Sequence, residues 1–262
     1  CIIDCERMDG SRCFRLFFWK KSPDLQKRMI KSPEKEIDMI LEKNENFVIN
    51  ESMIPPEMSV TIDNARELAR EFRDLRMRYH AAIKEISTKL EVLDNEFSVR
   101  NDYNPIHHMQ CRLKSIESIV DKIGRKGWPM EMESVYKVMD FAGVRVVCNY
   151  IDDIYTVEES LLRQDDIKLL KRKDYIKNPK ESGYRSLHLL VEVPIFLSDR
   201  TYNMPVEIQI RTIAMDTWAS LEHELKYKSK KEMPGYVVQE LKNCAKSMAD
   251  LDASMERIHK ML

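Results

Sequence analysis

Two neighbouring segments alternate apolar and polar residues, and this alternation limits the folds open to the chain more than any other feature. Successive side chains of a β-strand point to opposite faces, so residues 187–193 and 204–211 each predict a strand with one apolar face. The other face is chemically rich, with His188, Glu192, Glu207, Gln209 and Arg211. The apolar faces require a covering layer. The polar faces indicate a site, with an ordinary solvated surface as the alternative.

The rest of the chain predicts helices and further strands around these two segments. Apolar residues at steps of three and four predict a long helix over residues 65–97, capped by Thr61 or Asp63. The other elements, in order, are a loop over 100–111, a helix over 112–126 closed by Gly127 and Pro129, a short helix ending near Val138, a strand over 140–150, a helix over 152–164, a strand over 166–176, a helix over 213–228 capped by Thr212, and a heptad-like helix from about 239 to the end. We therefore expect an α+β domain with a mixed sheet of about five strands flanked by helices, plus long N- and C-terminal helices.

The amino-acid composition limits the kinds of molecule that the chain is expected to bind. Apolar residues make up 43% of the chain, which supports a packed core, and the net charge of −1 excludes a general polyanion binder. Any phosphate chemistry therefore needs a local basic cluster. No apolar run reaches the roughly 18 residues of a membrane span. The six cysteines have no metal-ligand spacing, so we expect free thiols and a cytoplasmic location.

A first basic cluster lies on the helix predicted over residues 112–126. Lys114, Ser118, Lys122 and Arg125 are spaced by four, four and three residues, so they share one stripe of that helix. Cations stacked on one stripe repel one another, and a bound triphosphate would offset the repulsion. A solvated basic face is the alternative explanation.

A second basic cluster lies in the loop before the first alternating strand. It comprises Lys171, Arg172, Lys173, Lys177, Lys180 and Arg185. Gly183 allows the backbone to approach a ligand closely, and Tyr184 is able to stack on a base. The loop lacks the pattern of a Walker phosphate-binding loop. A charged surface loop is the alternative.

Two carboxylates stand at positions suited to a metal. Asp140 precedes a predicted buried strand, and Glu207 lies on the polar face of another. Magnesium in proteins often takes one or two carboxylates and completes its shell with substrate phosphates and water. The pair is thus a candidate Mg²⁺ site, although an aspartate before a strand is also a common cap.

The order of these features resembles the RelA/SpoT-type alarmone synthetases, in particular their small, single-domain members. The matching segments are "RLKSIESIVDKIGRK", "DFAGVRVVC", "KRKDYIKNPKESGYRSLHLLVEVP" and "VEIQIRTIAMDTWASLEHELKYK". The resemblance implies a nucleotidyltransferase-like synthetase domain over residues 58–232, with an N-terminal extension of uncertain status over 1–57 and a C-terminal helix over 233–262. It also implies Mg²⁺-dependent transfer of pyrophosphate from ATP to the 3′-oxygen of GDP or GTP, giving AMP and (p)ppGpp.

The resemblance also assigns roles to individual residues. The ATP-binding set is Arg112, Lys114, Ser118, Lys122, Arg125 and Arg145. The set that binds the guanine nucleotide is Lys180, Tyr184, Arg185, His188 and Gln209. Asp140 and Glu207 are implied as catalytic residues and Mg²⁺ ligands, and Tyr184 as the side chain that stacks on guanine.

Several consequences of the resemblance remain open at this stage. The segment "KRKD" at residues 171–174 departs from the Arg-x-Lys-Asp of bifunctional relatives, so the preference between GDP and GTP is undecided. Nothing resembles the family's hydrolase domain, and synthesis without hydrolysis is expected. A homotetramer is expected, with packing of both long helices within one chain as the alternative. The competing functions are a related enzyme that uses a tRNA 3′ end or an adenine nucleotide as acceptor, and a non-enzymatic RNA-binding module.

Overall fold

The computed structural model describes residues 56–100, 102–129, 131–228 and 233–261. The predicted extension over 1–57 falls, except for its last two residues, outside the described residues. The chain divides into two units, Cys1–Ala69 and Arg70–Leu262, and the description below concerns the second. In the described residues, no helix is both long and apolar enough to cross a membrane.

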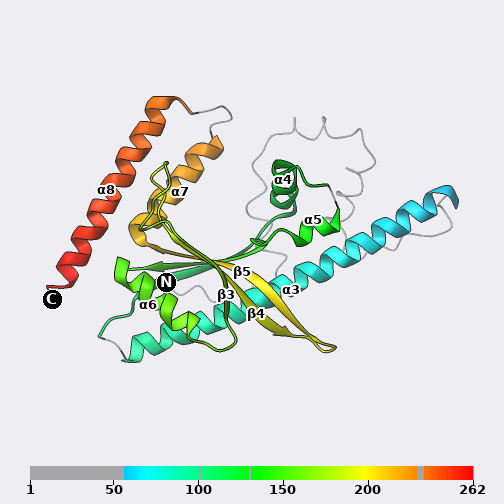
Figure 1. Ribbon diagram of the computed structural model, residues 1–262, viewed down its shortest axis with the longest axis horizontal. Coiled ribbons are helices and arrows are strands. Elements are labelled where there is room, and N and C mark those ends of the chain that lie inside the picture. The colour runs from blue at the N-terminus through cyan, green and yellow to red at the C-terminus, as the bar shows by residue number, and fades with distance from the viewer. Residues whose placement is uncertain (1–55, 101, 130, 229–232, 262) are drawn as a thin grey trace, which may run out of the picture. The chain divides into compact units, whose positions relative to one another are not determined.

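The described elements form the α+β fold that the sequence predicts (Figure 1). The helices are α3 (Pro56–Arg100), α4 (Ile116–Lys126), α5 (Met132–Tyr136), α6 (Ile151–Leu162), α7 (Ile213–Lys228) and α8 (Gly235–His259). The strands are β1 (Ile106–Leu113), β2 (Ala142–Cys148), β3 (Lys168–Asp174), β4 (Leu187–Phe196) and β5 (Thr201–Thr212). The expectation of a five-stranded mixed sheet flanked by helices is confirmed.

The sheet has the strand order β1-β2-β5-β4-β3. β2 and β5 run parallel at its centre, and the other neighbouring strands are antiparallel. The alternation seen in the sequence matches the burial, since Leu189, Val191, Val206 and Ile208 are fully buried on one face. The register Leu189↔Ile208 and Val191↔Val206 places these side chains beside one another on adjacent strands.

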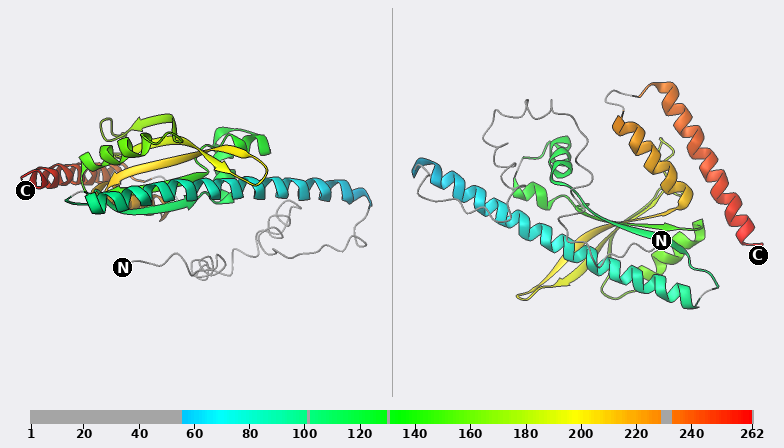
Figure 2. Two further views of the ribbon diagram at one scale, coloured as in Figure 1. Left: turned by 90° about the horizontal axis from the view of Figure 1, so that it is seen from below. Right: turned by 180° about the vertical axis from the view of Figure 1, so that it is seen from behind.

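Helices α3 and α6 cover the apolar face. The predicted three–four spacing of α3 is confirmed, and its buried residues are Leu75, Tyr79, Ala82, Ile86, Leu90, Leu93 and Phe97. Ile154, Val157 and Leu161 of α6 join the same core. Figure 2 shows α3 running across the sheet. Burial of these side chains supplies the main driving force for the fold, about 25 cal/mol per Å² of apolar surface.

One predicted segment is wrong. The loop predicted over residues 100–111 contains the edge strand β1, which pairs antiparallel with β2, and α4 begins only at Ile116. Ser115 caps α4, since its Oγ accepts a hydrogen bond from the backbone N–H of Ser118. The sequence of β1 hid the strand because only Ile106 of the eight residues is buried. An edge strand held mainly by backbone pairing needs no apolar alternation.

Helix α8 packs against α7 with part of its heptad-like stripe. Leu241 and Met248 lie against a small cluster formed by Trp218, Ala219 and Ala245. The later stripe residues Leu251, Met255 and Ile258 are exposed within this chain. Cys244 of the stripe is exposed as well, and the buried residues of α8 are Ala245, Asp252 and Glu256, which lie outside the stripe. The homotetramer stays a prediction.

Candidate functional site

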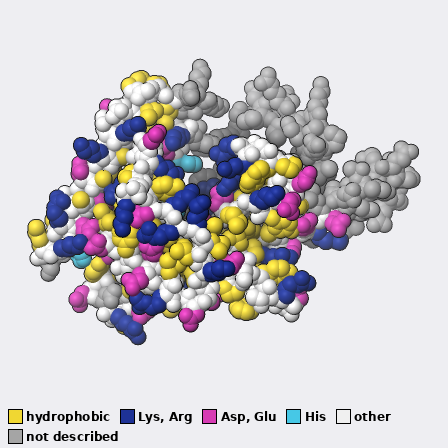
Figure 3. Space-filling model, in the orientation of Figure 1, with side chains coloured by type: hydrophobic (Ala, Val, Ile, Leu, Met, Phe, Trp, Pro, Cys, Tyr) yellow, Lys and Arg dark blue, Asp and Glu magenta, His cyan; other side chains and the backbone are white. Residues whose placement is uncertain are grey.

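The polar face of the sheet, defined here by Arg145, His188, Glu207 and Gln209, lies opposite α3. Directly paired residues of adjacent strands project to the same face. Gln209 of β5 pairs with Arg145 of β2 on one side and His188 of β4 on the other, and the three side chains form a row. Glu207 stands two residues along β5, beside Gly143. Lys and Arg side chains gather around a hollow between α7 and α4 (Figure 3).

Asp140 holds two lysines at one end of this face. Its Oδ2 lies 2.7 Å from Lys114 Nζ, and its Oδ1 lies 2.6 Å from Lys122 Nζ. Burial alone would raise the pKa of Asp140, but the hydrogen bonds and charges of the two lysines lower it below its ordinary value. The carboxylate thus stays ionised at neutral pH. Asp140 thereby links Lys114, which precedes α4, to Lys122, which lies within α4.

Glu207 is the second carboxylate of the face. Its Oε2 accepts a hydrogen bond of 3.0 Å from Gln209 Nε2, and its Oε1 lies 3.4 Å from His188 Nδ1. Burial would raise the pKa of Glu207, whereas His188 and Gln209 lower it, and the net shift is downward. The charge of Asp140 also acts on Glu207. The two carboxylates therefore share one electrostatic environment.

Tyr184 is tied to Glu207 through His188. Arg211 Nη2 donates to the Tyr184 hydroxyl at 2.5 Å, and that hydroxyl lies 2.8 Å from His188 Nε2. The two ring nitrogens of His188 thus face different partners, Nε2 the Tyr184 hydroxyl and Nδ1 the Glu207 carboxylate. The four side chains form a chain of polar contacts that ends at a carboxylate.

Lys180 and Tyr175 complete the surroundings of Tyr184. Lys180 Nζ lies 4.6 Å from the ring centre of Tyr175 and 4.7 Å from that of Tyr184. Tyr175 stands edge-on to His188, with ring centres 5.3 Å apart. An aromatic surface bordered by a cation suits a nucleotide, which carries both a base and phosphates.

Arg145 and Arg211 share one carboxylate. Asp216 Oδ1, from the first turn of α7, lies 3.2 Å from Nη1 of each arginine. Burial, together with the charge of Arg211, lowers the pKa of Arg145. Arg145 Nε is buried without a hydrogen-bond partner in the described part of the chain. A buried donor without a partner is costly, which makes this arginine a candidate for contact with an anion.

The remaining residues of the predicted ATP set lie around α4. Arg112 stands on β1, not on the helix as predicted, and its charge acts on Arg145. Lys114 also precedes α4, so the predicted stripe is wrong at this residue. Ser118 Oγ lies 3.0 Å from Ser115 Oγ, and Arg125 is exposed with its Nε donating to the carbonyl of Asp121.

Two residues of the Tyr184 loop, Arg185 and Gly183, contact α8 in the structure. Arg185 points away from the polar face, and its Nη1 lies 3.5 Å from Asp252 Oδ2 on α8. Gly183 has a φ of 91°, and a Cβ at this position would lie 2.4 Å from Ala245 Cβ, also on α8. This glycine therefore lies in close contact with a helix, and its approach to a ligand stays a prediction.

The sequence pointed to no role for three residues that organise the site, Tyr175, Asp216 and Asp252. It placed Arg211 on the polar strand face but assigned it no contact. Arg211 is 4% exposed, and its partners come from four positions of the chain. A buried arginine on a polar strand face is a signal for such a network, since buried cations need partners. Asp216 and Asp252 lie on helices and carry no comparable signal in the sequence.

Asp140 and Glu207 are the two carboxylates of this face that could hold a metal ion. The described residues contain no group of three or more His, Cys, Asp or Glu side chains that could hold a metal ion. Asp140 and Glu207 supply two carboxylates within electrostatic reach of one another. That donor set fits an ion that completes its shell with phosphate oxygens and water.

Comparison with known proteins identifies one family, through a family model, a similar protein and similar solved structures. Residues 111–232 match the family model described as a region found in RelA / SpoT proteins. The GTP pyrophosphokinase YwaC of Bacillus subtilis is 40% identical over 206 residues, covering 78% of this chain and 98% of the relative. Small alarmone synthetase 1 of the same organism, solved with its product pppGpp, superposes with a TM-score of 0.69 at 34% identity, covering 74% of this chain and 98% of that chain. Small alarmone synthetase 2 of B. subtilis gives 0.67 at 42% identity, covering 73% and 100%.

Proposed function

Because the chain belongs to the RelA/SpoT family, we propose that it transfers the β,γ-pyrophosphate group of ATP to the ribose 3′-oxygen of GDP or GTP. The acceptor oxygen forms a bond to the β-phosphorus. The bond between that phosphorus and the oxygen bridging to the α-phosphate breaks. AMP leaves with the bridging oxygen, the 3′-hydroxyl proton passes to a base, and the second product is (p)ppGpp.

The observation that carries this proposal is the meeting of two kinds of group on one face of the sheet. Asp140, with Lys114 and Lys122, lies at one end, and Tyr184 with His188 lies at the other. Glu207 is linked electrostatically to both. A reaction between two nucleotides requires this combination, since one end must neutralise phosphates and the other must hold a base.

On the donor side, we assign the phosphates of ATP to the cations near Asp140. Lys114 and Lys122 each have one carboxylate oxygen as a partner, and phosphate oxygens are acceptors of the same kind. Arg145 offers its unpartnered buried Nε. Arg112 is near enough to act on the charge of Arg145. These groups would neutralise charge that develops on the transferred group and on the leaving AMP.

On the acceptor side, we assign the guanine base to the ring of Tyr184. The ring orientation is fixed from its hydroxyl end by Arg211 and His188, so the ring needs little further ordering to receive a base. Lys180, above the same ring, is placed for the acceptor's phosphates. Glu207 remains ionised and is the group to which the 3′-hydroxyl proton would pass.

Mg²⁺ is the metal that this site would take. Asp140 and Glu207 would hold it, and the phosphates of the substrates would complete its coordination. When bound, the ion supplies charge neutralisation at the reacting phosphates. Lys114 and Lys122, which contact Asp140, would lie beside the same phosphates. Their short contacts with Asp140 keep this carboxylate ionised, and so ready for a cation.

The test is product analysis with purified protein. The protein is incubated with Mg²⁺, labelled ATP and either GDP or GTP, with and without excess EDTA, and the nucleotides are separated. We expect AMP and a pyrophosphorylated guanine nucleotide, lost with EDTA and reduced at least about 100-fold in Glu207→Gln. Glu192→Gln on neighbouring β4 is the matched control, because Glu192 pairs only with Lys168 among the described ion pairs.

The outcome separates this proposal from its competitors. Product from an adenine nucleotide or a tRNA 3′ end, and none from GDP or GTP, would transfer the assignment to that acceptor. A folded protein that binds RNA and turns over no nucleotide would refute the enzymatic assignment. The absence of hydrolase activity, the homotetramer and the cytoplasmic location remain predictions, to be checked by product stability, sedimentation and fractionation.

A further inference from the structure

Helix α8 contacts the Tyr184 loop so closely that it determines where the loop lies. Gly183 is the contact point, because any side chain there would collide with Ala245. The turn itself is closed by two backbone hydrogen bonds, from Gly183 to Lys180 and from Lys180 to Tyr184. The ring of Tyr184 packs on the cluster that Ala245 shares with Trp218. The family region ends at residue 232, before α8 begins at Gly235.

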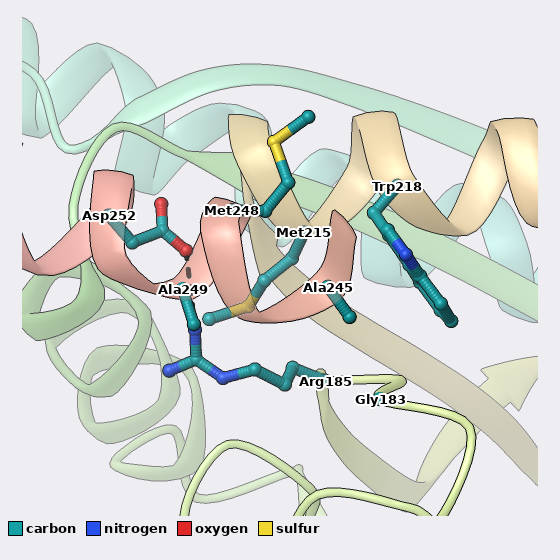
Figure 4. Close-up of a pocket in the computed structure, with 8 residues that line it drawn as sticks. All are labelled: Gly183, Arg185, Met215, Trp218, Ala245, Met248, Ala249 and Asp252. Atoms are coloured by element: carbon teal, nitrogen blue, oxygen red, sulfur yellow. Dashed lines mark ion pairs between the residues drawn. The ribbon is translucent and has the colours of Figure 1, made fainter. Parts of the chain in front are cut away.

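Asp252 is the polar centre of this contact (Figure 4). Its side chain is 7% exposed, and its Oδ2 accepts a hydrogen bond of 2.8 Å from Thr212 Oγ1. The same oxygen lies 3.5 Å from Arg185 Nη1. Thr212 ends β5, which carries Glu207, and its Oγ1 also caps α7 by accepting from the backbone N–H of Met215. One carboxylate thus joins the loop, the end of the catalytic strand and α8.

Arg185 has no competing partner for its buried end. Its side chain is 15% exposed, and Nη1 makes no hydrogen bond within the described part of the chain. Asp252 is therefore the charge partner of a guanidinium that folds under the loop. Figure 4 shows Arg185 reaching from the loop toward Asp252 beneath Met215 and Met248. The pocket around them is only ≈ 10 Å³, so the arginine has little room to reorient.

We propose that Asp252 is a positioning residue for the acceptor nucleotide, acting through Arg185 to fix the loop that presents Tyr184. This inference rests on the proposed function, because it takes Tyr184 as the acceptor's stacking surface. Asp252 touches neither the lysines of Asp140 nor Arg145, and an asparagine at this position could still accept from Thr212. Loss of the ion pair alone should therefore act mainly on the acceptor. Loosening the loop would make its ordering part of acceptor binding, and affinity would fall.

A stability argument separates positioning from folding. Burial raises the pKa of Asp252, although Thr212 and Arg185 act in the opposite direction. The ionised side chain therefore costs the folded state free energy at neutral pH. Asp252→Asn removes that charge, and its amide oxygen is still able to accept from Thr212. The charge that holds Arg185 is lost, and a buried guanidinium without its partner destabilises the folded state. The thermal midpoint should therefore fall in Asp252→Asn and recover in the double variant with Arg185→Gln, which removes both charges.

The test measures KM for both substrates in Asp252→Asn, Arg185→Gln and the double variant. We expect KM for the guanine nucleotide to rise about tenfold, equivalent to ~1.4 kcal/mol, with KM for ATP within about twofold. The double variant should match the single variants, because both changes break the same pair. Asp250→Asn, an exposed charge change on the same helix, is the control and should behave as wild type.

Three results would overturn the proposal. They are an unchanged guanine KM in folded Arg185→Gln, an equal rise of both KM values, and additive effects in the double variant. If Asp252→Asn does not fold, the KM values of Arg185→Gln alone test the proposal. If wild-type protein makes no product from any acceptor, the proposed function fails, but the inference about Asp252 can still be tested. Calorimetry then gives the Kd of GDP for wild type and variants. Equal Kd values, or no binding of GDP, would overturn the inference.

Discussion

Removal of one oxygen atom, in Tyr184→Phe, tests how the site holds its aromatic ring. The variant loses the hydrogen bond from Arg211 at 2.5 Å and the one to His188 at 2.8 Å. A hydrogen bond that involves a charged group contributes about 1.5–3 kcal/mol. Arg211 keeps Gln209 and Asp216 as partners, so no buried charge is left unpaired. The bond to His188 adds about 0.5–1.5 kcal/mol, so we expect a loss of about 2–4.5 kcal/mol in total.

That loss has two readouts. In a domain of this size the thermal midpoint falls by about 2–4 °C per kcal/mol, so it should be lowered by roughly 4–18 °C. The ring remains available for stacking, so KM for the guanine nucleotide should rise no more than about tenfold. Tyr184→Ala also removes stacking, about 1–3 kcal/mol per base, and should raise this KM further, with little change for ATP.

The assays are steady-state kinetics with each substrate varied and thermal unfolding by circular dichroism. Tyr236→Phe is the matched control, because Tyr236 is 74% exposed on α8. Wild-type values of both KM and thermal midpoint in Tyr184→Phe would refute the anchoring role of the hydroxyl. Equal KM values in Tyr184→Phe and Tyr184→Ala would refute the stacking role of the ring.

Two further predictions concern charge and core. Folding lowers the pKa of Asp140 below the ordinary 3.8, so the stability it contributes is present above pH 3.8 and is lost as pH falls through the lowered value. Asp140→Asn should therefore reduce the difference in urea midpoint between pH 7 and pH 3, and an unchanged difference would contradict the ion pairs. Leu189→Ala, at a fully buried position, should cost about 2–5 kcal/mol in urea unfolding, and a cost below about 1 kcal/mol would contradict the packing of this face.

Much of the fold could be predicted because burial follows local periodicity. The polar face could be predicted because alternation along each strand separates His188 and Glu207 from their buried neighbours. This period of two can be recognised without knowing the partner strand. The three–four spacing of α3 likewise gave its buried face. β1 escaped detection because an edge strand draws its stability from backbone pairing with β2, and pairing leaves no mark on side-chain type.

The sequence by itself determined which residues were available for the site, including Asp140, Glu207, Tyr184 and the basic clusters, since residue type and spacing carry that information. Only the tertiary structure decided which of them meet. Lys114 and Lys122 converge on Asp140 from different elements, and Arg185 turns away from Tyr184 to Asp252, 67 positions later in the chain. The physical reason is that a charge is compensated by the nearest partner in space. That partner is set by how helices pack on the sheet, which no local pattern in the sequence records.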